Sequence, residues 1–314
     1  MTNAEPIFAI GLDHRVDFCR EIVGSGERPG AAEREQAASL KLAVFDAVAQ
    51  AVEDGLPKSS VVAWADPDLG EGALLRARAM SIAIAVSVDR PGDGTAGLSF
   101  DTTGDAWSLM SRLAAQYAGT RTNYNFASET SARENAQQQL RLLAGKCSEA
   151  GRKLIIELAP HATERQIADA GGADTAPLRA QLLIEGMRAL QDAGVEPSAW
   201  VVAPPPDELI AATVAGQAHV DGRAGVSVLF EVGSEPDPGR LTPGPSRADR
   251  AVARLAARTL GVGGVVAGPD LYFSTLVRLH QGLIERADAV AEISTHLRKV
   301  WEIYAGARRA SGVA

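Results

Sequence analysis

The chain has 314 residues, of which 46% are hydrophobic and 5% aromatic, and its formal net charge is −8 at pH 7. This supply of apolar side chains is sufficient for a large core, and the length lies within the range of a single α/β barrel. The excess of acidic residues excludes a broad surface for nucleic acid or anionic lipid, although local arginine pockets remain compatible with it.

Neither an export signal nor a membrane span is evident in the sequence. The first residues lack a basic segment followed by an apolar run, and no later segment supplies about 18 uninterrupted apolar residues. We therefore expect a cytoplasmic protein without a membrane partner. Cys19 and Cys147 belong to no CxxC pair, so we interpret both as reduced, structural thiols.

Short apolar runs alternate regularly with longer segments of helical periodicity. The alternation predicts one (β/α)8 TIM barrel, a single domain spanning 1–314. A doubly wound sheet alternates in the same way, but it seldom reaches eight units, and no GxGxxG follows the first run. The predicted strands are 8–12, 61–65, 82–88, 119–124, 153–158, 199–203, 226–232 and 264–267.

The first predicted strand ends abruptly in three ionisable residues, Asp13, His14 and Arg15. Such a group is costly inside a core and natural at the polar mouth of a barrel. We predict Asp13 to be catalytic and His14 and Arg15 to bind substrate. The alternative is that Arg15 pairs with Asp13 or Asp17 and fixes the loop. Asp66, which follows the second strand, is also predicted to bind substrate.

Further polar side chains end the fourth, fifth and seventh predicted strands. Glu157 follows an apolar strand, so its carboxylate must be paired, neutral or functional. Arg121 either binds an anionic substrate or neutralises Glu157. We predict Arg121 and Glu157 to be catalytic, and Asn123 and Glu231 to bind substrate.

Two segments that follow strands, 89–105 and 231–246, are rich in Gly, Pro and Asp. In a barrel such loops lie on the face that carries the active site, so they are candidate walls of a pocket. Plain surface insertions are an equally compatible interpretation.

Spacing predicts neither a metal site nor a strong phosphate site. Glu157 and His161 flank a loop, and no third ligand is indicated. We expect no cofactor, with a divalent metal as the minor alternative. Phosphate is usually bound after the last two strands by backbone N–H groups, and Pro269 removes one such donor.

The lysines decide against imine chemistry. A Schiff-base enzyme needs an amine in its pocket, and the chain has five lysines, none of them in a suitable predicted position. They are Lys41 and Lys146 in outer helices, Lys58 in a turn, Lys153 at the start of the fifth strand on the wrong face, and Lys299 in the last helix.

Several segments, in their order and spacing, resemble one family. They are FAIGLDHRVDF, Leu40-Lys41, KLIIELAP, GVEPSAWVVAP, GGVVAGPDLYF and the terminal VWEIY. Over nearly its whole length the chain resembles the 2-deoxy-5-keto-D-gluconate 6-phosphate aldolase domain of inositol catabolism and, more remotely, class I tagatose-bisphosphate aldolases. The resemblance implies a barrel and, as site residues, Asp13, His14, Arg15 and Glu157.

The departures from that family concern its chemistry. The family's Schiff-base lysine falls at Val201, its neighbouring acid at Ala203, a further lysine at Arg121, and a phosphate-gripping arginine at Pro269. Valine forms no imine, and arginine stays protonated.

We therefore predict an aldolase-like carbon–carbon lyase that does not use a Schiff base. Its partner would be a small anionic keto sugar or keto sugar acid, with or without phosphate, and a homo-oligomer is compatible with the sequence. The alternative is a non-catalytic barrel that binds a metabolite or a protein partner.

Overall fold

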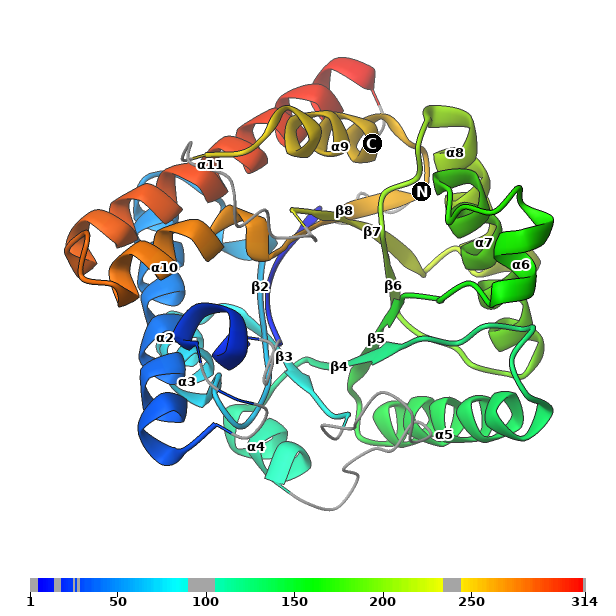
Figure 1. Cartoon of the computed structure of the whole chain (residues 1–314), viewed down its shortest axis with the longest axis horizontal. Coiled ribbons are helices and arrows are strands. Elements are labelled where there is room, and N and C mark those ends of the chain that lie inside the picture. The colour runs from blue at the N-terminus through cyan, green and yellow to red at the C-terminus, as the bar shows by residue number, and fades with distance from the viewer. Residues whose placement is uncertain are drawn as a thin grey trace.

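The structure is a computed structural model that describes residues 5–13, 18–24, 26, 29–89, 105–233 and 244–312. Within these residues, eight parallel strands close into a barrel in chain order, with helices around it (Figure 1). The predicted TIM barrel is confirmed. The strands are β1 (Ile7–Leu12), β2 (Val61–Ala65), β3 (Ala83–Ser87), β4 (Tyr117–Thr122), β5 (Lys153–Leu158), β6 (Ala199–Val202), β7 (Ser227–Val232) and β8 (Val262–Ala267).

The helices of the outer layer begin at residues suited to that role. Thr163, Thr175, Asp207 and Ser246 precede helices and accept a hydrogen bond from a first-turn N–H group, which satisfies a donor that the helix leaves unpaired. The helices are α2 (Ala31–Glu53), α3 (Glu71–Ala79), α4 (Asp105–Leu113), α5 (Thr130–Glu149), α6 (Glu164–Asp169), α7 (Ala176–Asp192), α8 (Glu208–Ala218), α9 (Arg247–Arg258), α10 (Phe273–His280) and α11 (Arg286–Ser311), with short turns η1 (Cys19–Val23), η2 (Lys58–Ser60), η3 (Val220–Gly222) and η4 (Pro269–Leu271).

Strand β4 begins and ends two residues earlier than the predicted 119–124. Its pairing with β5 starts at Tyr117, opposite Lys153. The chain turns after Thr122, where the Asn125 side chain accepts a hydrogen bond from the N–H of Ala127 at 2.9 Å. Asparagine side chains that bond to nearby backbone favour turns over strands.

The interior of the barrel is filled with side chains. Trp64 lies there in a buried cluster, and its Nε1 donates a hydrogen bond to Ser87 Oγ at 3.0 Å. Gly119 of β4 lies against the indole, and a Cβ at this position would overlap the ring. The barrel is therefore packed below its mouth. The cluster also contains Ala9, Val62, Ala85, Ile155, Ala199, Val201, Leu229 and Val266.

The last helix closes the outer layer beside α2 and α9 (Figure 1). The Trp301 ring packs at 5.8 Å, centroid to centroid, from that of Phe8 in β1. Cys19 and Cys147 are both buried and unbonded, as the sequence indicated. Over the described residues, no helix has the length and apolar character needed to cross a bilayer.

Candidate active site at the carboxyl ends of the strands

An arginine–glutamate pair lies at the mouth of the barrel. Arg121 and Glu157 are partners in the register of β4 and β5, and Arg121 Nε lies 3.1 Å from Glu157 Oε1. The Glu157 side chain is 7% exposed, whereas that of Arg121 is 46% exposed. The structure therefore brings together two residues predicted to be catalytic, in the arrangement in which arginine offsets the buried carboxylate.

Further carboxylates surround this pair. Burial raises the pKa of Glu157 well above its usual range, and the charges of Glu231, Asp13 and Asp89 raise it further, against the lowering effect of Arg121. These acids follow or end β7, β1 and β3, so the side chains converge from separate strands. A carboxyl group with a raised pKa retains its proton at higher pH and can act as a general acid.

Asp13 and Asp89 are two of the acidic residues whose charges act on Glu157 at the mouth. Asp13 follows β1 and is half-buried. Burial raises the pKa of Tyr272, the charge of Asp13 raises it further, and the Tyr272 hydroxyl donates to the Gly11 carbonyl at 2.6 Å. Asp89 begins the predicted loop 89–105 but was not among the predicted site residues. Its position directly after the apolar run 82–88 was the available signal. His14 and Arg15 lie outside the described residues.

Asp66 forms a buried ion pair rather than an exposed binding group. Its Oδ2 pairs with Lys41 Nζ, both side chains are 0% exposed, and Lys41 also donates to the Leu12 carbonyl at 2.6 Å. Asp66 Oδ1 accepts the N–H groups of Asp68 at 2.9 Å and Leu69 at 2.7 Å. This burial weighs against the predicted substrate contact of Asp66. Asn123, by contrast, is exposed just beyond β4.

All five lysines belong to described residues. Lys41 is in α2, as predicted, but its Nζ is buried at the carboxyl ends of β1 and β2, where it is held by Asp66 and the Leu12 carbonyl. Lys153 shares a face of β5 with Ile155 and Glu157, so the prediction that it lies on the wrong face was wrong. It lies at the opposite end of the strand from Glu157, with its Nζ 5.7 Å from the Tyr117 ring centroid. Lys58 precedes β2, Lys146 lies over Trp107, and Lys299 is in α11.

The position where the resemblance places a Schiff-base lysine is apolar. Val201 is 0% exposed within the interior cluster and is the register partner of Glu157. An amine that replaced it would adjoin the carboxylate, but valine provides no nucleophile. Among the described residues, no group of three or more His, Cys, Asp or Glu side chains is placed to hold a metal ion.

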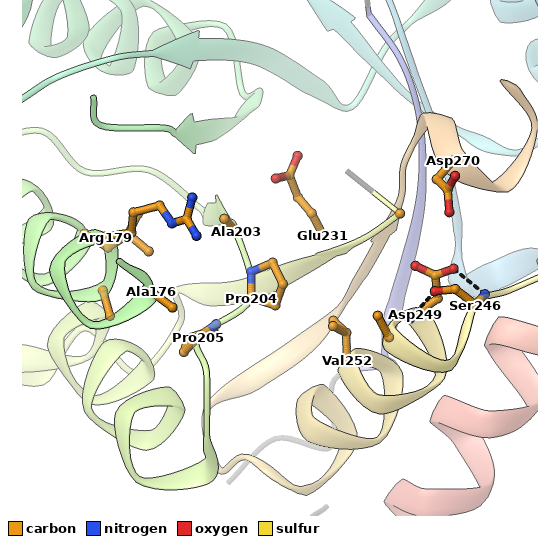
Figure 2. A pocket seen from close by; sticks show the side chains of 14 residues that line it. Ala176, Arg179, Ala203, Pro204, Pro205, Glu231, Ser246, Asp249, Val252 and Asp270 are labelled. Carbon is orange, nitrogen blue, oxygen red and sulfur yellow. Dashed lines mark hydrogen bonds between the residues drawn. The ribbon is translucent and has the colours of Figure 1, made fainter. Parts of the chain in front are cut away.

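A cavity of about 430 Å³ adjoins the mouth on the side of β6, β7 and β8. In Figure 2 the Arg179 side chain extends from α7 toward Ala203 and Glu231, with Asp249 and Asp270 on the other side. Glu231 is common to the cavity and the mouth. The remaining lining residues are Ala176, Ala180, Leu183, Pro204, Pro205, Gly233, Ser246, Ala248 and Val252.

Residues 1–235 match DUF2090, a family described as an uncharacterized protein conserved in bacteria. The chain belongs to this family. No curated protein matches the DUF2090 chain.

Solved structures share its fold at low identity. A protein of Corynebacterium glutamicum superposes with a TM-score of 0.60 at 13% identity, over 96% of this chain and 87% of that one. An archaeal fructose 1,6-bisphosphate aldolase gives 0.59 at 12% identity, over 98% and 96%. Triosephosphate isomerase from Bartonella henselae gives 0.50 at 12% identity, over 96% and 99%. The DUF2090 chain therefore has the TIM-barrel fold that aldolases also adopt.

Proposed function

We propose that this DUF2090 protein is an aldolase-type lyase that cleaves a carbon–carbon bond without forming an imine. The substrate would be a small anionic keto sugar or keto sugar acid. The observation that carries the proposal is the Arg121–Glu157 pair at the barrel mouth, 3.1 Å apart and surrounded by the carboxylates of Asp13, Asp89 and Glu231.

These residues match the requirements of a retro-aldol step on a β-hydroxy carbonyl compound. Asp13 or Glu231, as a carboxylate, takes the hydroxyl proton while the bond between the α and β carbons breaks. The electron pair of that bond becomes an enolate, whose oxygen Arg121 holds by charge-assisted hydrogen bonds. Glu157 then gives its proton to the α carbon, and an aldehyde and a new carbonyl compound result.

Without an imine, the electron pair of the broken bond needs another electron sink. One of the solved structures of this fold is a Schiff base-forming fructose-1,6-bisphosphate aldolase, with a TM-score of 0.53 at 11% identity. Here Val201 stands where the resemblance expects the lysine, and Arg121 lies on the neighbouring side of Glu157. A fixed cation stabilises a developing oxyanion without covalent chemistry.

The test is a retro-aldol assay of the full chain with a panel of keto sugar acids, each with and without a terminal phosphate. We expect turnover that survives borohydride, because no imine forms, and that survives EDTA. Glu157→Gln should lower kcat by about a hundredfold or more, whereas Glu149→Gln, at an exposed position in α5, should leave kcat unchanged.

Three results would count against the proposed lyase. Inactivation by borohydride in the presence of substrate would show an imine and refute the proposed chemistry. Normal turnover of Glu157→Gln would remove Glu157 from the mechanism. Tight binding of a keto sugar acid without cleavage would favour the alternative of a non-catalytic metabolite-binding barrel, which the buried Val201 at the position of the family's lysine also supports.

A further inference from the structure

The cavity beside the mouth extends the candidate site in one direction. Glu231 of β7 contributes to both, since its charge acts on Glu157 and its side chain lines the cavity. A substrate whose reacting carbons lie at Glu157 therefore continues past Glu231 toward α7 and α9. The composition of this cavity determines which substrate tail fits there.

Three backbone N–H groups at positions that often bind phosphate in this fold are already engaged. After β8, the N–H of Gly268 donates to the Val232 carbonyl at 2.8 Å, and that of Asp270 donates to the Gly233 carbonyl at 2.9 Å. Pro269 between them has no N–H group. At the start of α9, the N–H of Asp249 donates to Ser246 Oγ at 2.9 Å. These N–H groups are directed to protein acceptors instead of a ligand.

The side chains at the same place are acidic. Asp270 follows β8, Asp249 belongs to the first turn of α9, and Glu231 belongs to β7, and all three line the cavity. Carboxylates accept hydrogen bonds from hydroxyl groups, but they repel a phosphate dianion. Among the described lining residues, Arg179 is the cation. Its side chain is 50% exposed, and its Nη1 lies 3.6 Å from Oδ2 of Asp174, an exposed residue outside the cavity lining.

We propose that this cavity holds an unphosphorylated polyhydroxylated tail ending in a carboxylate. The hydroxyl groups would donate to Glu231 and Asp270, and the terminal carboxylate would bind the Arg179 guanidinium, a planar donor that matches a carboxylate. This inference rests on the proposed function and narrows its substrate class from keto sugar derivatives in general to sugar acids without phosphate.

The direct test compares the binding of D-gluconate and D-glucitol 6-phosphate to the full chain by calorimetry. Both probes are six-carbon polyhydroxylated chains, one ending in a carboxylate and the other in a phosphate, and neither requires turnover. We expect D-gluconate to bind about tenfold more tightly or better, because the acidic lining opposes the phosphate dianion. Arg179→Ala should weaken D-gluconate binding, whereas Arg188→Ala, at an exposed position later in α7, should not. Asp270→Asn should reduce the discrimination between the probes.

Equal or tighter binding of D-glucitol 6-phosphate would overturn the inference, as would the failure of both probes to bind at millimolar concentration. Preferential binding of D-gluconate that Arg179→Ala leaves unchanged would refute the assignment of Arg179. Selective binding together with no carbon–carbon cleavage of any keto sugar acid would retain this subsite and reject the lyase, so the two proposals fail separately.

Discussion

Glu157 experiences opposing influences at the mouth of the barrel. Burial and the charges of Glu231, Asp13 and Asp89 favour its protonated form, while Arg121 favours the carboxylate. Their places near the ends of predicted strands indicated that Glu157 and Arg121 are site residues. It did not predict whether Arg121 serves the substrate or the glutamate, because that depends on the register of β4 against β5, which the sequence leaves open.

Glu157→Gln should make the stability of the protein less dependent on pH. The folded pKa of Glu157 is raised, so the folded state holds a proton that the unfolded state has lost above about pH 4.3, the ordinary glutamate value. Folding free energy is therefore lost as pH rises from that value through the folded pKa. Urea unfolding at a series of pH values should show the variant gaining stability over the parent across this window. A constant difference would contradict the raised pKa.

The same pKa direction determines the alkaline limb of activity. If protonated Glu157 is the acid, kcat should fall as pH rises through its folded pKa, and that limb should lie above the pH expected of an ordinary glutamate. A pH–rate profile of the parent protein measures the limb. An alkaline limb that Glu157→Gln retains at residual activity would have to be assigned to another group.

At the scale of elements, a buried ion pair joins α2 to the ends of β1 and β2. Lys41 reaches from the helix to Asp66 and to the Leu12 carbonyl, just before Asp13. The sequence contained a signal for this burial, because Lys41 lies on the helix face of Val44 and Phe45, which are both buried. The partner could not be predicted, since the pairing depends on how α2 packs on the barrel.

Lys41→Met should destabilise the protein by about 3–5 kcal/mol, because it leaves Asp66 buried without its cation. The double variant Lys41→Met with Asp66→Asn should recover much of this loss. Asparagine keeps an oxygen for the Asp68 and Leu69 N–H groups and carries no charge. Urea unfolding of the single and double variants checks this, and equal losses in both would show that the charge is not the cause.

At the scale of the whole molecule, the periodic alternation of strands and helices predicted the barrel because it repeats through the chain. The cavity was not predictable, since its walls come from β7, α7, α9 and the segments that follow β6 and β8, which are separate in sequence and meet only after closure. The predicted loop walls 89–105 and 231–246 fall largely on 90–104 and 234–243, which lie outside the described residues.

The packing of the barrel interior depends on the fit between Trp64 and Gly119. Gly119→Ala should cost about 1–3 kcal/mol, because the added methyl group overlaps the indole inside a packed core. Near-ultraviolet circular dichroism should report the displaced tryptophan. Gly145→Ala is the matched control: this glycine is inside α5 with no neighbour in reach of a methyl group, so it should stabilise the protein by about 0.5–1 kcal/mol. Equal effects would contradict the packing argument.

The packed interior around Trp64 also prevents a ligand from passing through the barrel. Because Trp64 and its neighbours fill the interior beneath the mouth, a ligand that enters at the carboxyl ends of the strands has no exit at the other end. The two fragments of a cleaved substrate would then depart by the way they came, and the fragment nearer the opening would leave before the deeper one. Product inhibition should accordingly be competitive for the last fragment to depart and noncompetitive for the first.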